Sequence, residues 1–315
     1  MIKNPTVAVC SRSFSNNQYL RKELEKEYDS VIFNDLGKSL SGKDLIDFLS
    51  TATHAIIALE DINEEILNAL PRLKVVSKYG VGIDKLDLNA LSKYNIKLGW
   101  TGGVNKRSVS ELVISFSISL LRNTYISDKE VKNQIWRQHV GRLLTNKIVG
   151  IIGCGHIGKD LVELLQPFQC KVIVNDIIEY KEFNKKNNIK FTSLNELLRE
   201  SDIVTIHTPL NHTTKNILSS EKLRLLKEDS ILINLARGGL VDESYLKTML
   251  KSGAIRGAAL DVFNCEPPND DELINMHNII TTSHIGGSAQ EAIIAMGLAA
   301  IDGLKNNQSP ELFKT

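Results

Sequence analysis

Three polar residues stand where strands are expected to end in the second half of the chain, and a loop-forming sequence flanks each one. Arg237 follows the run Ile231–Asn234, Glu266 precedes two prolines, and His284 precedes Ile285 and two glycines. Taken singly, the arginine could be a solvated loop charge, the glutamate a surface residue and the histidine a structural one. Ligands gather at the carboxyl ends of strands in open α/β sheets, so the common position of all three favours one shared site.

Together these side chains have the chemistry needed to reduce a 2-keto acid beside a nicotinamide. The planar guanidinium of Arg237 can bind a carboxylate and polarise the adjacent carbonyl. The imidazole of His284 can give a proton to the alkoxide that develops as hydride arrives, and it can act as a base in the reverse direction. Glu266, hydrogen-bonded to that imidazole, would orient the ring and stabilise the imidazolium.

A glycine turn supplies the expected nicotinamide site. The apolar run 148–152 leads into Gly153-Cys154-Gly155-His156-Ile157-Gly158, and an amphipathic segment follows to Leu165. In a strand–turn–helix unit, Gly153 permits the turn, Gly155 lets the backbone approach a pyrophosphate, and Gly158 lets helix and strand pack closely. The free N–H groups of the helix then face an anion. The glycine pattern alone is weak evidence, because glycines also punctuate ordinary turns, but its flanks favour a dinucleotide site.

The choice of cofactor depends on Asp176. This residue ends the next expected strand, 18 residues after Gly158, where a ribose 2′-hydroxyl would need an acceptor. A carboxylate there repels a 2′-phosphate, and Ile177 and Ile178 provide no cation to relieve that repulsion. We therefore expect NAD rather than NADP, although Lys181 is near enough in sequence to leave NADP open.

Two series of alternating strands and helices must position these residues. The first occupies about the first hundred residues, and the second places strands at 148–152, 171–175, 202–206, 230–234, 255–260 and 278–281. Such alternation predicts an α/β fold with two Rossmann-like, doubly wound parallel-sheet domains. The helix expected at 288–304 lies beyond the sixth strand and should return to the first domain. We predict a discontinuous substrate domain at 1–103 plus 288–315, and an NAD-binding domain at 104–287. Between the two series, we expect a long helix at 105–122 and a further helix at 128–140.

Composition limits the class of protein. The chain has 315 residues, 38 basic and 37 acidic side chains and a net charge of +1, so no strong global field recruits nucleic acid or a membrane. No window approaches the roughly 18 apolar residues of a membrane span, and the N-terminus lacks a signal-peptide core. The four cysteines form no C-x-x-C pair, which favours reduced thiols over disulfides or a metal site. We expect a cytoplasmic protein that binds no metal.

Over nearly its full length the chain resembles the D-isomer-specific 2-hydroxyacid dehydrogenase family, and within it the phosphoglycerate dehydrogenase-like members. The ordered signatures are Tyr79-Gly80-Val81-Gly82-Ile83-Asp84, Gly153 to Gly158, His207-Thr208-Pro209-Leu210, Asn234 to Gly239, Val241-Asp242-Glu243, Leu260-Asp261-Val262-Phe263 with Glu266-Pro267, and His284-Ile285-Gly286-Gly287. The resemblance implies an NAD-dependent enzyme that interconverts a small 2-keto acid and its (R)-2-hydroxy acid.

The resemblance also assigns residues to roles. The family's catalytic Arg, Glu and His fall on Arg237, Glu266 and His284. Cofactor contacts fall on Gly153, Gly155, His156, Ile157, Gly158, Asp176, Thr208, Pro209, Leu235, Ala236, Arg237, Asp261, His284, Gly286 and Gly287. Substrate contacts fall on Val81, Gly82 and Arg237, with Lys78 as a candidate that could equally be a solvated loop lysine. Asp261 would meet the nicotinamide carboxamide, and a homodimer would form through residues 105–140.

Two departures bear on the substrate. Phosphoglycerate dehydrogenases usually carry an Arg after the strand that matches Ala55 to Ala58, whereas this chain continues Leu59-Glu60-Asp61, whose carboxylates would repel a phosphate. The chain also ends at Thr315, so we expect no C-terminal regulatory domain of the kind found in longer members. A phosphorylated substrate and feedback by serine are therefore both in question.

Two alternatives stay open at this point. A non-catalytic NAD(H)-sensing scaffold or corepressor could use the same fold, since fold alone does not fix function. The presence of Arg237, Glu266 and His284 argues against it, because a pure sensor needs no such set. A different hydride donor, such as formate or phosphite, is also possible, but no additional residue demands it.

Overall fold

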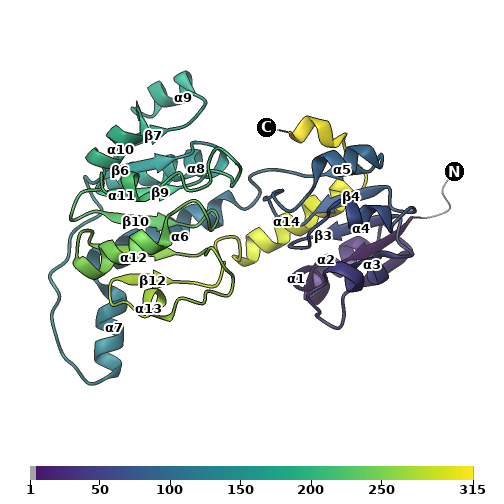
Figure 1. The fold of residues 1–315 in the computed structure, drawn as a ribbon, viewed down its shortest axis with the longest axis horizontal. Coiled ribbons are helices and arrows are strands. Elements are labelled where there is room, and N and C mark those ends of the chain that lie inside the picture. The colour runs from purple at the N-terminus through teal and green to yellow at the C-terminus, as the bar shows by residue number, and fades with distance from the viewer. Residues whose placement is uncertain (1–4, 315) are drawn as a thin grey trace. The chain divides into compact units, whose positions relative to one another are not determined.

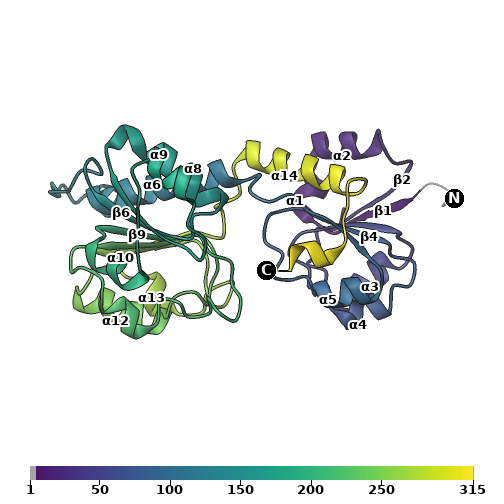
Figure 2. The ribbon, with the colours of Figure 1, turned by 90° about the horizontal axis from the view of Figure 1, so that it is seen from above.

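The computed structural model describes residues 5–314, and the chain divides into two compact units. One unit consists of the residues up to Asn105 and those from Ser288 onward, and the other is Lys106–Gly287. Each is a parallel sheet with helices on both faces (Figures 1 and 2), so the predicted fold class is confirmed. Within residues 5–314, no helix is long and apolar enough to cross a membrane.

The first unit holds a five-stranded parallel sheet in the order β2-β1-β3-β4-β5. Its strands are β1 (Thr6–Val9), β2 (Ser30–Phe33), β3 (His54–Ile57), β4 (Val75–Lys78) and β5 (Lys97–Gly99). Its helices are α1 (Arg12–Asn16), α2 (Gln18–Glu25), α3 (Gly42–Leu49), α4 (Glu64–Asn68), α5 (Leu88–Lys93) and α14 (Gln290–Gly303), followed by the 3₁₀ turn η2 (Pro310–Phe313).

Two apolar layers cover the sheet of this unit. Helices α3, α4 and α5 bury leucines such as Leu49, Leu67 and Leu91 on one face. Helices α1, α2 and α14 cover the other face (Figure 2), where Leu20 packs against Gly297 of α14. The C-terminal helix α14 thus completes the core of the N-terminal sheet, because it packs beside α2 and covers β4 and β5.

The second unit holds a seven-stranded parallel sheet in the order β12-β11-β10-β9-β6-β7-β8. Its strands are β6 (Ile148–Ile152), β7 (Lys171–Asn175), β8 (Lys190–Phe191), β9 (Ile203–Ile206), β10 (Ile231–Asn234), β11 (Gly257–Leu260) and β12 (Ile279–Thr281). The sequence predicts six of these strands. The seventh, β8, has only two residues, too few to produce an apolar period.

The order reverses between β6 and β9, and this is the topological switch point at which open sheets of this kind bind ligands. The helices of the unit are α6 (Lys106–Arg122), α7 (Thr124–Lys132), α8 (His156–Leu165), α9 (Lys181–Lys186), α10 (Leu194–Glu200), α11 (Ser220–Leu223), α12 (Glu243–Ser252) and α13 (Asp271–Ile274). A 3₁₀ turn, η1 (Gln166–Phe168), follows α8. Helices α6 and α8 pack on one face of the sheet, and α10, α12 and α13 pack on the other (Figure 2). Helix α11 adds Leu223 to the same apolar core as α10 and α12.

The predicted helix at 128–140 is wrong in its extent. Helix α7 runs from Thr124 to Lys132, and Gln134 then takes a left-handed backbone conformation with φ of 63°. Such a residue ends a right-handed helix. The following segment carries exposed apolar side chains and no regular structure, with Trp136 87% exposed and Val140 94% exposed.

Candidate functional site

The candidate residues of the second unit all follow strands of one parallel sheet. The glycine turn follows β6, Asp176 follows β7, and Thr208 follows β9. Arg237, Asp261 and His284 follow β10, β11 and β12 in the same way. Because every strand pairing in this sheet is parallel, these residues emerge at the same edge.

His284 and Glu266 form a hydrogen-bonded pair at this edge. The distance between His284 Nδ1 and Glu266 Oε2 is 2.9 Å, and both side chains are a little under two-fifths exposed. The other carboxylate oxygen, Oε1, accepts the backbone N–H of Phe263 at 3.2 Å, so the glutamate is held at both oxygens. An ionised carboxylate can only accept, which places the hydrogen on Nδ1 and leaves Nε2 for proton transfer.

The backbone of His284 is unusual. Its φ is 55°, in the left-handed region that few residues other than glycine adopt, at a cost of roughly 1–2 kcal/mol. Surrounding contacts must therefore hold this conformation. The loop that carries it is fixed to the start of α6, since the Ser108 hydroxyl donates to the Gly286 carbonyl at 2.6 Å.

Asp261 supplies most of the contacts to the His284 loop. It is 1% exposed, and its carboxylate accepts from the Thr282 hydroxyl at 2.6 Å and from the N–H groups of Ile285 and Gly286 at 2.7 Å each. Its own carbonyl accepts the His284 N–H at 2.9 Å. The motif match assigns Asp261 to a cofactor contact, whereas in the structure most of its hydrogen-bonding capacity serves this loop.

Arg237 lies on the loop after β10, which packs directly on the loop that bears Glu266. A Cβ at Gly238 would overlap the carbonyl oxygen of Phe263, so only glycine allows this approach. The Gly239 N–H donates to Asn264 Oδ1 at 2.5 Å and joins the same two loops. The guanidinium of Arg237 donates to the carbonyl of Ala236 at 2.7 Å.

Asn234 shapes the loop of Arg237, and sequence reasoning gave it no role. It is 2% exposed, its amide nitrogen donates to the Arg237 carbonyl at 2.8 Å, and its side-chain oxygen accepts the Ala236 N–H at 3.0 Å. A polar residue at the end of a fully buried strand was the available signal, because buried amides require partners.

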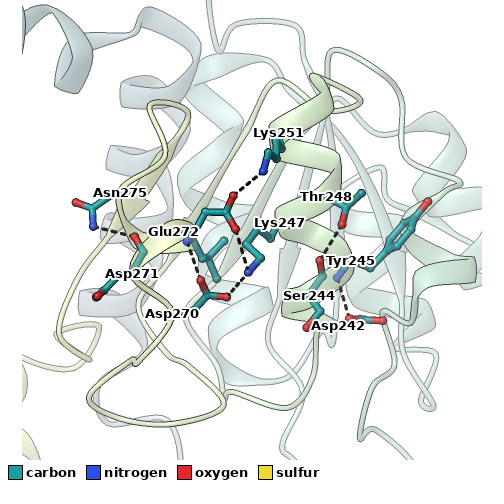
Figure 3. A network of polar contacts seen from close by, with 11 residues as sticks. Asp242, Ser244, Tyr245, Lys247, Thr248, Lys251, Asp270, Asp271, Glu272 and Asn275 are labelled. Atoms are coloured by element: carbon teal, nitrogen blue, oxygen red, sulfur yellow. Dashed lines mark hydrogen bonds and ion pairs between the residues drawn. The ribbon is translucent and has the colours of Figure 1, made fainter.

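Behind the Glu266 loop, charged groups connect α12 and α13 (Figure 3). Lys247 bonds to Asp270 at 2.7 Å, and Lys251 bonds to Glu272 at 2.7 Å. Asp270 also caps α13 by accepting the Leu273 N–H at 3.0 Å. These contacts anchor the C-terminal end of the loop that runs from Asp261 past Glu266.

Glu243, at the start of α12, holds the middle of that loop by accepting the Asn264 N–H at 2.7 Å. Burial, together with the nearby charges of Asp270 and Glu266, raises the pKa of Glu243, while the Asn264 bond opposes that rise. Sequence reasoning used Glu243 only as part of the family signature and missed this supporting contact.

The glycine turn has the shape of a phosphate cradle. Gly153 has φ of 92°, and a Cβ there would lie 2.8 Å from the backbone of His207. A Cβ at Gly158 would overlap the carbonyl oxygen of Gly153, so helix α8 can pack this closely against the turn only if residue 158 is glycine. At Gly155, by contrast, no atom of residues 5–314 outside the adjoining chain lies within 4 Å of an added Cβ. The start of α8 at His156 and Ile157 therefore faces open space at the turn.

Asp176 lies against this turn, as the 18-residue spacing suggests. Its carboxylate accepts the Cys154 N–H at 2.5 Å and the Ile178 N–H at 3.0 Å. Burial and the Asp176 charge raise the pKa of the Cys154 thiol to about 11, so it stays neutral inside the turn. Lys159 sits over the ring of Tyr180 at 3.3 Å from its centroid.

Two buried polar atoms beside the turn have no partner within residues 5–314. They are His207 Nδ1 and Thr208 Oγ1, which follow β9, next to Pro209. Buried polar atoms are normally satisfied, so these two await a polar ligand or water. Together with the open face at Gly155 and the carboxylate at Asp176, they fit a dinucleotide at this edge. Burial lowers the pKa of His207 to about 3, which keeps that imidazole neutral.

The predicted substrate residues Lys78, Val81 and Gly82 belong to the first unit. Lys78 is 6% exposed and its ammonium donates to the Ala58 carbonyl, so it is not a solvated loop lysine. The Val81 carbonyl accepts the Trp100 indole N–H at 3.1 Å, which fixes the loop that ends at Gly82.

The carboxylates that follow β3 are engaged within the first unit. Glu60 accepts the Ala58 N–H at 2.6 Å, and Asp61 pairs with Lys85 at 3.3 Å. Their negative charge is therefore partly compensated, which weakens the sequence argument that this loop repels a phosphate.

A doubly wound sheet with a glycine turn at its switch point, and with an acceptor carboxylate after the next strand, defines a dinucleotide-binding domain of the Rossmann class. The model of the D-isomer specific 2-hydroxyacid dehydrogenase, NAD binding domain, matches residues 114–286, more than half of the chain. The chain belongs to the D-isomer specific 2-hydroxyacid dehydrogenase family, and its second unit contains the NAD-binding domain. The resemblance drawn from the motifs is thereby confirmed.

Individual relatives agree with this family. The chain is 31% identical over 297 residues to a D-3-phosphoglycerate dehydrogenase of Methanocaldococcus jannaschii, covering 93% of this chain and 57% of that protein. It is 31% identical over 278 residues to a glyoxylate reductase of Pyrococcus horikoshii, covering 85% and 83%. The structure of a D-lactate dehydrogenase from Aquifex aeolicus, complexed with NAD and lactic acid, superposes with a TM-score of 0.81 at 25% identity, covering 94% and 93%. The chain spans about half the length of the D-3-phosphoglycerate dehydrogenases that it matches.

Proposed function

We propose that this chain is an NAD-dependent oxidoreductase that interconverts a small 2-keto acid and its (R)-2-hydroxy acid. The observation that carries the proposal is the 2.9 Å contact between His284 and Glu266, on the sheet edge that also bears the glycine turn. A hydrogen-bonded imidazole–carboxylate pair is the arrangement that general acid–base catalysis uses. We assign the NAD-binding role to residues 104–287 and the substrate-binding role to residues 1–103 plus 288–315.

In this reaction His284 is the proton carrier. Nε2 donates its proton to the carbonyl oxygen of the keto acid, and in the oxidative direction it takes the proton back. Glu266 keeps the ring oriented through Nδ1 and stabilises the imidazolium. Arg237 binds the substrate carboxylate in a bidentate fashion. When bound, the nicotinamide supplies or accepts the hydride.

The residues assigned to the cofactor are those around the glycine turn and the neighbouring strand ends. Gly155 and the start of α8 would hold the diphosphate, and Asp176 would accept from the ribose hydroxyls. The carboxylate of Asp176 also favours NAD over NADP, because it would repel a 2′-phosphate. Thr208 supplies one unpartnered hydroxyl at the same edge.

On the substrate side, we assign the loop of Val81 and Gly82 to the substrate carboxylate and Lys78 to the organisation of that loop. The relatives named above act on acids as different as 3-phosphoglycerate and glyoxylate, so the substrate class proposed here includes both phosphorylated and simple keto acids. The negative charges of Glu60 and Asp61 are partly compensated by their contacts with the Ala58 N–H and with Lys85, so a phosphorylated acid stays within that class.

A homodimer and a cytoplasmic location complete the proposal. The support for a dimer is the exposed apolar group on the segment after α7, where Trp136 is 87% exposed and Val140 is 94% exposed. Large exposed apolar side chains that cluster commonly mark an interface. The support for the cytoplasm is that all four cysteines are free thiols.

The test is a substrate panel with the purified chain. Glyoxylate, hydroxypyruvate, pyruvate and 3-phosphohydroxypyruvate are each offered with NADH, and the absorbance of NADH is followed. We expect oxidation of NADH with at least one of these acids. Tight binding of NADH without turnover on any keto acid would instead favour the sensing scaffold or corepressor, for which the named relatives give no support. Formate and phosphite with NAD form a further arm that tests the other hydride donors.

A further inference from the structure

One buried carboxylate controls the loop that presents His284. Asp261 ends β11, is 1% exposed, and accepts hydrogen bonds from three groups on the neighbouring segment, the Thr282 hydroxyl and the N–H groups of Ile285 and Gly286. These three residues flank His284 on both sides. The carbonyl of Asp261 accepts the N–H of His284 itself.

This set of contacts accounts for the left-handed backbone of His284. Without the four bonds, a residue with a Cβ would leave φ of 55° for the right-handed or extended region. Rotation of that backbone would carry the imidazole off Glu266. The side chain of Glu266 is itself tied to Phe263, two residues after Asp261, so one strand end organises both members of the pair.

We propose that Asp261 is a positioning residue, whose task is to hold the His284 loop so that the imidazole stays on Glu266. The kinetic test of this inference rests on the proposed function. The hydrogen bonds of Asp261 do not, because they are formed within the chain itself. A carboxylate has about four lone-pair sites, and three donors occupy them here. The single remaining site is compatible with an amide of a bound cofactor, which is the role that the family resemblance assigns. A positioning role and a cofactor-contact role predict different effects of a substitution at Asp261 on kcat/KM and on the Kd for NADH.

The main variant is Asp261→Asn, which keeps the size of the side chain but replaces one acceptor oxygen with an NH₂ donor. The positioning role predicts that kcat/KM for keto-acid reduction falls about 10- to 100-fold, while the Kd for NADH stays within about twofold. A loss of NADH affinity with unchanged kcat would overturn the inference in favour of the cofactor contact. The matched control is Ser117→Ala, which removes a buried hydroxyl–carbonyl bond of 2.7 Å inside α6 and should change neither quantity.

A double-mutant cycle tests whether Asp261 acts through the pair. In a Glu266→Gln background, the His284–carboxylate pair is already broken, so Asp261→Asn should cost little more. Fully additive losses would overturn the inference. If Asp261→Asn does not fold, Thr282→Val decides, since it removes one of the three donors with an isosteric side chain. We expect it to lower kcat/KM about 2- to 10-fold. Behaviour like that of Ser117→Ala would count against the proposal.

A readout without turnover separates this inference from the proposed function. The chemical shift of the His284 Cε1–H resonance can be measured by NMR at one fixed pH and assigned by its loss in His284→Ala. In Asp261→Asn this chemical shift should move in the same direction as in Glu266→Gln, because the imidazole has left its carboxylate partner. If the wild type reduces no keto acid, the proposed function fails, and this chemical shift still decides the positioning role. A wild-type chemical shift in Asp261→Asn would overturn it.

Discussion

Two substitutions in the glycine turn should separate an effect on cofactor binding from an effect on the stability of the fold. Gly155 and Gly158 stand three residues apart, but an added methyl group meets different surroundings at each. At Gly155 no atom of the described residues outside the adjoining chain lies within 4 Å of the new Cβ, whereas at Gly158 the Cβ overlaps the Gly153 carbonyl and lies 3.3 Å from an Ile151 methyl. Gly155→Ala should therefore leave the fold intact, and Gly158→Ala should strain it.

The expected magnitudes follow from this geometry. In Gly155→Ala the methyl group fills the face assigned to the diphosphate, so one charge-assisted hydrogen bond from the turn is lost, worth about 1.5–3 kcal/mol. The Kd for NADH should rise roughly 10- to 100-fold, with the melting temperature close to that of the wild type. In Gly158→Ala, overpacking of about 1–3 kcal/mol should lower the melting temperature by roughly 2–12 °C.

The assay is NADH fluorescence titration together with thermal unfolding of the wild type and both variants. Wild-type NADH affinity in a folded Gly155→Ala would refute the assignment of the open face to the cofactor. A large loss of thermal stability in Gly155→Ala would refute the claim that the space around an added methyl group at Gly155 is open. Gly158→Ala is the matched comparison, because it carries the same added methyl group on the same turn.

Three further measurements bear on other parts of the molecule. Asp176→Asn should lower the ratio of kcat/KM with NADH to that with NADPH by roughly tenfold or more, because the repulsion of a 2′-phosphate is removed; an unchanged ratio would count against Asp176 as the selector. His207 has a pKa of about 3 in the fold and about 6.5 in the unfolded chain, so acid favours unfolding between these values. Its contribution to the free energy of unfolding, complete above pH 6.5, should fall by about 2 kcal/mol by pH 5, and His207→Gln should flatten the dependence of melting temperature on pH. Trp136→Lys should shift a homodimer toward monomer in sedimentation velocity, whereas Leu36→Lys, at a similarly exposed site with 79% exposure on the other unit, should not.

Much of the fold could be predicted because its signals are local. Short apolar strands alternate with amphipathic helices, and polar residues mark the ends of β10, β11 and β12. The strand β8 and the end of α7 escaped prediction. The first is too short to show a period, and the second depends on the backbone conformation of Gln134, which its side chain does not signal.

In the site, too, the residues with local sequence signals were predictable, and the contacts that form only in the folded sheet were not. Residue type and position sufficed to bring out His284 and Glu266, and the structure places them in contact. The function of Asp261 could not be read from its position, because it depends on donors 21 to 25 residues away that meet it only in the folded sheet. The burial of Lys78 is similarly tertiary, since its partner carbonyl at Ala58 belongs to the neighbouring strand's loop. Spacing along a chain locates strand ends, but it does not show which buried groups satisfy each other across them.

The most direct test of the account is the pairing of His284→Ala with NADH binding in the same preparation. Keto-acid reduction should fall about 10²- to 10⁴-fold, because the proton donor is gone, while the Kd for NADH should stay within about twofold of the wild type. Wild-type turnover by a folded His284→Ala that binds NADH normally would contradict the central claim that this imidazole carries the proton.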